Sequence, residues 1–176
     1  MKKVPPRQVP TRDQFYMGLA LWYASKSKDP RTQCGSCIVS KENKTLSFGY
    51  NGPPARIKDT DIDWDRPAKY PFMVHAEANA IRRVKIRADM DGATIYVNAK
   101  PCSACMLEIA DTGISKVIYI PSKNLDKGSM LSNANISSET DEIALFAGIP
   151  LEIFKENLSW MRDRIEFMEE VGVFDN

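Results

Sequence analysis

One short string of residues has the types and spacing of a catalytic metal site. His75, the only histidine among 176 residues, stands two positions before Glu77, and the segment Pro101-Cys102-Ser103-Ala104-Cys105 begins 24 residues after Glu77. One imidazole and two thiolates make three ligands, the number that a catalytic zinc takes when it keeps its fourth position for water. The string therefore predicts one zinc site formed by His75, Cys102 and Cys105.

Two helix starts are expected to position these side chains. Cys102 and Cys105 are three residues apart, and Pro101 suits a first helical turn, so both sulfurs should lie on one helix face. Free N–H groups at such a start favour thiolate over thiol. His75 and Glu77 should lie in the first turn of another helix. From there Glu77 would compete poorly as a ligand, which leaves it to carry protons.

The pattern H-x-E…P-C-x-x-C is the signature of zinc-dependent nucleobase deaminases, and the chain resembles the deoxycytidylate deaminases of the cytidine deaminase-like superfamily. Three further segments carry the resemblance: Asp29-Pro30-Arg31-Thr32-Gln33, Gly49-Tyr50-Asn51-Gly52 and His75-Ala76-Glu77-Ala78-Asn79-Ala80-Ile81. With the zinc string they cover roughly residues 11–120. The second segment and the long polar insertion after it narrow the choice to deoxycytidylate deaminases within the superfamily.

The resemblance implies hydrolysis of dCMP to dUMP and ammonia, in support of dTTP synthesis. Zinc would lower the pKa of water, but two thiolate ligands offset its charge, so a neighbouring carboxylate must help to remove the proton. Glu77 is expected to pass that proton to ring nitrogen 3 of the cytosine. Hydroxide then attacks carbon 4, and Glu77 protonates the departing amino group.

The resemblance also implies nucleotide contacts. Asn51 would hydrogen-bond the sugar of the substrate, although Asn51-Gly52 could instead form only a turn. Ala76 and Tyr119 are implied as further substrate contacts. The segment Gly49-Tyr50-Asn51-Gly52, placed at subunit contacts of a homohexamer, would bind the activator dCTP and the inhibitor dTTP, with Mg²⁺ on the triphosphate.

Cations near predicted loop ends are the candidates for binding the substrate phosphate. Lys26 and Arg31 are preferred among them. Lys26 stands where arginine is common in the family, so its contact would be a point charge in place of a bidentate fork. Each cation has an alternative interpretation as an ordinary solvated charge. The remaining candidates are Arg56, Lys58, Lys123 and Lys127.

The other cysteines form a second CxxC pair, Cys34 and Cys37. A four-cysteine zinc ribbon is disfavoured, because 64 residues lie between Cys37 and Cys102 and the surroundings of the first pair are typical of a strand. Both are therefore interpreted as packing residues. Some family members bind a second zinc through His and Cys in the insertion, but residues 53–72 contain neither. One zinc per subunit is expected.

Hydrophobic periodicity predicts the elements around the site. A helix capped at Thr11 or Asp13 is followed by a hairpin and then by strands that alternate with helices, which indicates an α/β class with a mixed sheet. The resemblance implies a three-layer, cytidine deaminase-like fold with five strands. The predicted ranges are strands 34–39, 45–50, 93–98, 116–120 and 151–154, helices 75–87, 102–111 and 137–147, and a helical tail.

The length, charge and hydropathy of the chain limit its domain organisation and its location in the cell. We expect one domain over residues 1–176, with an exposed arm at 1–10, a polar insertion at 53–72, and a final strand and acidic helix at 151–176, a segment whose net charge is −4. No apolar run approaches a membrane span, and prolines interrupt the N-terminus where a signal peptide would be apolar, so a cytoplasmic protein is expected.

Two alternatives to a dCMP deaminase stay open. A zinc deaminase acting on cytosine or adenine in tRNA or single-stranded DNA would need a basic groove with stacking aromatics, and the formal net charge of +1 argues against nucleic acid as a partner. A non-catalytic, zinc-bearing regulatory protein would need neither Glu77 nor an open metal position.

Overall fold

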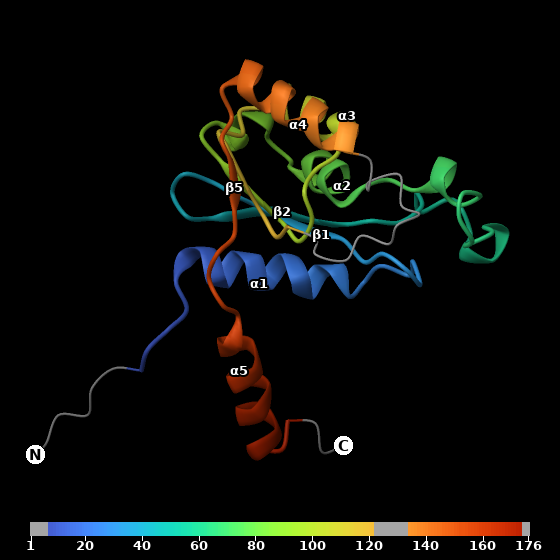
Figure 1. The fold of residues 1–176 in the computed structure, drawn as a ribbon. Coiled ribbons are helices and arrows are strands. Elements are labelled where there is room, and N and C mark those ends of the chain that lie inside the picture. The colour runs from blue at the N-terminus through green and yellow to red at the C-terminus, as the bar shows by residue number, and fades with distance from the viewer. Residues whose placement is uncertain (1–6, 122–133, 174–176) are drawn as a thin grey trace, which may run out of the picture.

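The computed structural model describes residues 7–121 and 134–173, and within them one five-stranded sheet forms the centre of the molecule (Figure 1). The strand order is β2-β1-β3-β4-β5. Strand β1 pairs antiparallel with β2 and β3, whereas β3, β4 and β5 are parallel. The predicted mixed sheet is confirmed. The strands are β1 (Gly35–Val39), β2 (Thr45–Tyr50), β3 (Thr94–Val97), β4 (Lys116–Tyr119) and β5 (Leu151–Ile153).

Helices cover both faces of the sheet, which gives the three layers expected. Helix α1 (Arg12–Ala24) lies on one face, and α2 (Ala76–Arg83), α3 (Ser103–Ala110) and α4 (Ala134–Ala147) lie on the other (Figure 1). Helix α5 (Ser159–Glu170) extends away from the sheet on the α1 side. In the part of the chain that the structure describes, no helix has both the length and the apolar character needed to cross a membrane.

Alternating side chains of the strands form a core on each face, because successive residues of a strand point to opposite sides. On the α1 side, Cys37, Val39 and Tyr96 are buried against α1. On the other side, Ile38, Ile95, Val97 and Val117 form a core with residues of the remaining helices, among them Ala80, Met106, Ile109 and Ala144.

Close contacts between β2, β1 and α2 fix where α2 begins. An ideal Cβ placed on Gly49 would lie 1.9 Å from the carbonyl oxygen of Ala76, so only glycine permits this approach. Ser36 Oγ donates to that same carbonyl at 2.8 Å, and Ser47 Oγ donates to the carbonyl of Ala80 at 2.7 Å. The first turn of α2 is thereby held against the sheet.

Helix ends differ from the prediction in two places. Helix α2 ends at Arg83, four residues before the predicted end, and residues 84–86 are irregular before a 3-10 helix over Arg87–Met90. Helix α4 begins at Ala134, before the serine cap predicted at residue 137. The insertion contains two short 3-10 helices, η1 (Asp59–Asp61) and η2 (Tyr70–Phe72).

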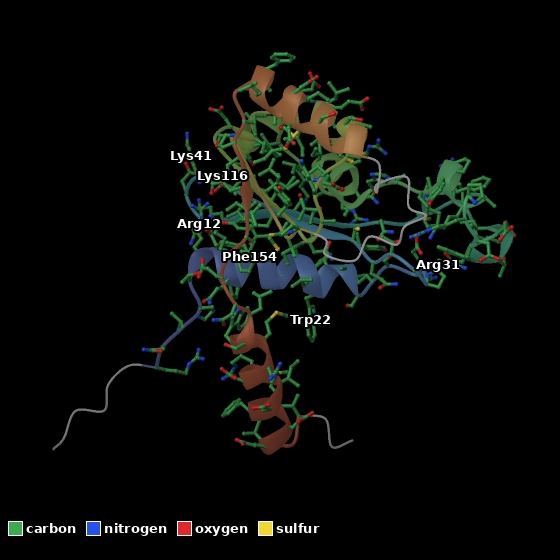
Figure 2. The ribbon with its side chains drawn as sticks, in the orientation of Figure 1. Arg12, Trp22, Arg31, Lys41, Lys116 and Phe154 are labelled. Carbon is green, nitrogen blue, oxygen red and sulfur yellow. The ribbon has the colours of Figure 1, made fainter. Side chains whose placement is uncertain are left out.

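Helix α5 packs against α1 through Trp160 and Met161. The ring of Trp160 lies 6.1 Å from that of Phe15, and a Cβ on Gly18 would lie 2.6 Å from Trp160. Trp22 points away from the sheet on the side where α5 lies, and 59% of its surface is exposed (Figure 2). The α1 side of the molecule therefore presents apolar surface.

Candidate active site

The N-termini of α2 and α3 meet at the predicted metal ligands. His75 is the N-cap of α2 and Cys102 the N-cap of α3, and neither side chain caps its own helix. His75 Nδ1 lies 3.4 Å from Cys102 Sγ and 3.3 Å from Cys105 Sγ. In a tetrahedral zinc site, bond lengths of about 2.0–2.3 Å would separate nitrogen and sulfur ligands by about 3.6 Å. The donor set and its spacing therefore fit zinc.

The two thiols interact strongly. A hydrogen bond from Cys105 lowers the pKa of Cys102 to about 4, helped by the contact with His75. The same bond, together with burial, raises the pKa of Cys105. The hydrogen bond to Cys102 raises the pKa of His75 to about 9. A metal binds cysteine as the thiolate and histidine as the neutral imidazole. Metal binding would therefore release the protons that these three side chains share.

Glu77 lies in the first turn of α2 and only 5% of its surface is exposed. Burial raises the pKa of its carboxyl group, while the nearby charge of His75 acts in the opposite direction. A carboxyl group with a raised pKa accepts and releases protons closer to neutral pH than a solvated one does. Its place in a cavity beside the predicted metal ligands suits the predicted role as proton carrier.

A cavity of about 330 Å³ opens at this cluster. That volume is at the lower end of the range for small-molecule sites, which is about 300–1,000 Å³. Its walls come from the loop after α1, the end of β2, the insertion, and the starts of α2 and α3. They comprise Asp29, Thr32, Cys34, Asn51, Arg66, Lys69, Tyr70, Met73, His75, Ala76, Glu77, Val97, Ala99, Lys100, Cys102 and Ser103.

Asn51 and Ala76 both line this cavity, as a substrate role would require. Asn51 also has structural partners: its Oδ1 accepts the N–H of Cys34 at 2.8 Å and its Nδ2 donates to the carbonyl of Thr32 at 2.9 Å. A primary amide has two N–H donors, so one remains for a ligand. Tyr119 is 9% exposed in β4 and is absent from the described residues that line the cavity. The substrate roles stay predictions.

The preferred phosphate cations lie elsewhere. The side chain of Arg31 is exposed and pairs with Asp65 at 3.2 Å, and Lys26 lies over the ring of Tyr50 at 5.9 Å. Neither is among the described residues that line the cavity. Arg56 and Lys58 are exposed. Lys123 and Lys127 lie outside the described residues.

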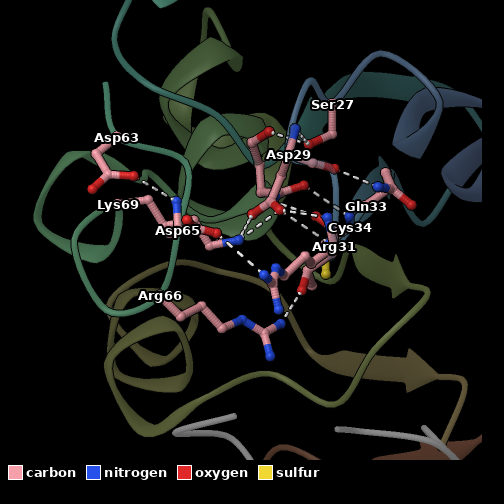
Figure 3. Close-up of polar contacts among 11 residues, drawn as sticks. Ser27, Asp29, Arg31, Gln33, Cys34, Asp63, Asp65, Arg66 and Lys69 are labelled. Atoms are coloured by element: carbon pink, nitrogen blue, oxygen red, sulfur yellow. Dashed lines mark hydrogen bonds and ion pairs between the residues drawn. The ribbon is translucent and has the colours of Figure 1, made fainter. Parts of the chain in front are cut away.

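The insertion contributes cavity residues that the sequence analysis missed, above all Arg66 and Lys69 (Figure 3). Arg66 Nη2 donates to the hydroxyl of Thr32 at 2.7 Å, and Lys69 Nζ lies 2.6 Å from both carboxylate oxygens of Asp29. Residues 53–72 have no hydrophobic periodicity, so no local pattern separates an inward cation from a solvated one. Lys100, just before the zinc string, is a further missed cation.

The second cysteine pair behaves as two different packing positions. Cys37 is fully buried beneath α1, and Cys34 lies in the cavity wall. Burial raises the pKa of each thiol to about 12. Both thiols are therefore neutral near pH 7. Among the described residues, neither thiol belongs to a group of three or more side chains that could hold a metal, which agrees with their interpretation as packing residues.

Each residue of the Gly-Tyr-Asn-Gly segment has a separate structural position. Gly49 touches α2 and Asn51 faces the cavity, while Gly52 pairs with Val74. The centroid of the Tyr50 ring lies 5.9 Å from Lys26 Nζ and 5.3 Å from the guanidinium carbon of Arg83. This arrangement gathers positive charge and an aromatic face outside the cavity.

Comparison with known proteins agrees with this geometry. Residues 10–121 match the profile described as the cytidine and deoxycytidylate deaminase zinc-binding region. Deoxycytidylate deaminases from Mus musculus and Homo sapiens are 41% and 40% identical over 119 residues, which are 64% of this chain and 66% of each relative. The chain thus matches slightly less than two thirds of these relatives' length.

A solved structure shares the fold. The dCMP deaminase of cyanophage S-TIM5, in complex with dCMP and dUMP, aligns with a TM-score of 0.67 and 23% identity. The alignment covers 84% of this chain and 100% of the phage chain. The three-layer architecture around the His/Cys/Cys cluster is therefore that of a deaminase fold.

Proposed function

The chain belongs to the family with the cytidine and deoxycytidylate deaminase zinc-binding region, and from that premise we propose that it hydrolyses dCMP to dUMP and ammonia. One observation carries the proposal: His75, Cys102 and Cys105 converge at the wall of a cavity that also contains the buried Glu77. Relatives named deoxycytidylate deaminases, at about 40% identity, support dCMP as the substrate.

The metal implied by the family is zinc, held by His75, Cys102 and Cys105. When bound, zinc would lower the pKa of water and so supply a hydroxide nucleophile near neutral pH. Two negative sulfur ligands offset the charge of zinc, so this acidification is weaker than with three histidines. A proton acceptor close to the ligands is therefore needed, and Glu77 is the carboxyl group in the cavity wall nearest to them in sequence.

Glu77 carries the protons of the reaction. It accepts a proton from the attacking water and delivers it to ring nitrogen 3 of cytosine, which makes carbon 4 electrophilic. The oxygen of water then bonds to carbon 4, and Glu77 takes the second proton from this new hydroxyl group. Glu77 delivers that proton to the amino group, so that ammonia leaves as the bond between carbon 4 and nitrogen breaks and the carbonyl group of uracil forms. The products are uracil and ammonia. The raised pKa of Glu77 suits both steps.

Arg66 is proposed as the phosphate contact, in place of Lys26 and Arg31. Its side chain lines the cavity and its Nη2 donates to the hydroxyl of Thr32 at 2.7 Å, whereas neither Lys26 nor Arg31 is among the described residues that line the cavity. A guanidinium offers two parallel donors to a phosphate. Arg66→Gln should raise the KM for dCMP about tenfold to a hundredfold, the value of a hydrogen bond to a charged group. Turnover of deoxycytidine, which lacks the phosphate, should stay within about twofold.

Ammonia release from dCMP, dCTP, cytidine and oligonucleotides, measured in parallel, tests the proposed activity. We expect the highest kcat/KM with dCMP, and loss of all release in Glu77→Gln. Preference for an oligonucleotide would favour a deaminase of tRNA or single-stranded DNA. A zinc-loaded protein that releases no ammonia from any of them would be a non-catalytic zinc protein.

Regulation by nucleotides is a further part of the proposal. The resemblance assigns dCTP activation and dTTP inhibition, with Mg²⁺ on the triphosphate, to the Gly49-Tyr50-Asn51-Gly52 segment. The two cations on the ring of Tyr50, Lys26 and Arg83, support an anion site at this place. Saturation curves for dCMP with either triphosphate and Mg²⁺ test it: dCTP should lower, and dTTP raise, the dCMP concentration at half-maximal rate.

Assembly into a homohexamer is also proposed from the resemblance. Large apolar side chains are exposed on two elements, including Trp22 of α1 at 59% and Phe146 of α4 at 85%. Exposed apolar side chains of this size are typical of interaction surfaces. Light scattering should give a particle of six times the chain mass of 19.8 kDa, and a monomer at micromolar concentration would contradict the proposal.

A further inference from the structure

A buried ion pair joins the insertion to the loop after α1. Lys69 Nζ lies 2.6 Å from each carboxylate oxygen of Asp29, and the two side chains are 2% and 3% exposed. Lysine and aspartate are almost never this buried unless they are paired. Removing both charges from water is costly, and an apolar pair would often serve stability as well or better. The pair therefore calls for an explanation beyond stability.

The carboxylate of Asp29 also fixes the backbone that follows it. Its Oδ1 accepts the N–H groups of Arg31 at 2.9 Å and Thr32 at 3.1 Å. The carbonyl of Thr32 in turn accepts a hydrogen bond from the amide of Asn51. A continuous series of bonds thus runs from Lys69 through Asp29 and Thr32 to Asn51.

All members of this series line the cavity beside the metal ligands. Arg66, three residues before Lys69, donates to the hydroxyl of Thr32 at 2.7 Å, so the insertion holds the same loop at two points. Two further ion pairs, Lys28–Asp59 and Arg31–Asp65, join the same segments on the exposed surface. Only the Lys69–Asp29 pair, among these ionic links of the described chain, is buried.

We propose that Lys69 is a positioning residue for nucleotide binding: through Asp29 it holds Thr32 and Asn51 in the geometry that receives the nucleotide. Lys69 does not itself bind the nucleotide, because its ammonium group is already paired with the carboxylate of Asp29. The insertion is then a permanent wall of the binding site. This inference rests on the proposed function, since it assumes that the cavity receives a nucleotide.

The decisive variant is the double substitution Asp29→Asn with Lys69→Met. It removes both buried charges, and the amide oxygen that Asp29→Asn introduces can still accept the N–H groups of Arg31 and Thr32. We expect normal zinc content and a kcat within about threefold of the parent, with a KM for dCMP about tenfold to a hundredfold higher. A purely stabilising role would leave KM unchanged.

Single and control variants complete the experiment. Lys69→Met leaves a buried charge without its partner and is expected to lower the melting temperature as well as to raise KM. If it does not fold, the double variant decides. Lys28→Met removes an exposed pair between the same two segments, with side-chain exposures of 66% and 39%, and should leave KM within about twofold.

Three results would overturn the proposal: an unchanged KM in the double variant, an equal rise of KM in Lys28→Met, or loss of zinc from the double variant. The last would mean that the pair supports the metal centre. Failure of the proposed function is seen separately, because then the parent protein would show no turnover of dCMP.

Discussion

At the residue scale, the chemistry depends on what surrounds one carboxyl group. Glu77 lies two residues after the N-cap of α2, and its burial raises the pKa of its carboxyl group. Its neighbours His75, Cys102 and Cys105 are the group that can hold a metal. Burial and placement thus agree with the proposed division between a proton carrier, Glu77, and metal ligands, although His75 and Glu77 are only two residues apart in the chain.

Glu77→Gln tests this division of roles. The substitution keeps size and hydrogen bonding but removes the proton acceptor, and general acid–base catalysis contributes roughly 10²- to 10⁴-fold. Because one residue serves several proton transfers, we expect a loss of turnover at or beyond the upper end. Zinc content by atomic absorption and affinity for dCMP should match the parent. More than about a tenth of parental turnover would exclude Glu77 as the proton carrier.

The two CxxC pairs should respond oppositely to serine. Cys102→Ser removes a proposed ligand and should abolish stoichiometric zinc binding. Cys37→Ser places a hydroxyl in a fully buried strand position and should keep its zinc while losing about 1–3 kcal/mol of unfolding free energy. Metal analysis and urea denaturation of both variants check this. Loss of zinc from Cys37→Ser would contradict the packing assignment.

The sequence pattern predicted that the residues of the His/Cys/Cys cluster lie together, and the structure brings them together. It did not predict which residues of the insertion line the cavity, and this difference has a physical reason. Ligands of one metal need particular residue types at short spacings, and those survive as a readable pattern at His75 and Cys102. The partner of Lys69 is 40 residues away in the chain, and nothing local marks either residue. Pairing of this kind is decided by the tertiary fold alone.

At the element scale, the position of α2 depends on close approach to β2. A Cβ on Gly49 would lie 1.9 Å from the Ala76 carbonyl oxygen, which belongs to the turn that carries Glu77. In the same segment, a Cβ on Gly52 would meet nothing nearer than 3.7 Å. The structure therefore leaves no space for a side chain at Gly49, whereas it has space for one at Gly52.

Gly49→Ala should displace the start of α2, whereas Gly52→Ala should not. We expect Gly49→Ala to lose about 1–3 kcal/mol or more, since the clashing atom is backbone and cannot rotate away. Its zinc affinity should fall as well, because His75 moves with the helix. Gly52→Ala should stay within about 1 kcal/mol. Thermal unfolding and zinc titration measure the stability and the zinc affinity of both variants. Equal losses in the two variants would contradict the role of the close contact at Gly49.

Element boundaries show where sequence patterns stop being informative. The serine and acidic residues at 137–142 resemble a helix cap, but serine also occurs inside helices, and α4 already begins at Ala134. Helix α2 ends early because Val84 adopts an extended conformation, with ψ of 122°, after its N–H bonds the carbonyl of Ile81. No glycine or proline marks that end.

At the scale of the whole molecule, the candidate metal site joins segments that the chain separates widely. Helix α2 packs mainly on β1 and β2, and α3 packs on α4. The proposed ligands His75 and Cys102 are the N-cap residues of α2 and α3. Zinc bound there would connect the antiparallel part of the sheet, β1 and β2, to its parallel part, β3, β4 and β5. The free energy of zinc binding would therefore add to the stability of the folded state.

Removal of zinc should therefore lower the melting temperature of the whole domain. A ligand at about a thousand times its Kd stabilises by about 4 kcal/mol, which corresponds to roughly 10 °C for a chain of this size. We expect a single cooperative transition that shifts down by this amount after chelation, and one zinc per chain before it. Cys102→Ser should melt near the chelated parent, with or without added zinc. Two zincs per chain that persist in Cys102→Ser would show a second site, and an unchanged melting temperature after complete zinc removal would show that the metal does not connect the two parts of the sheet.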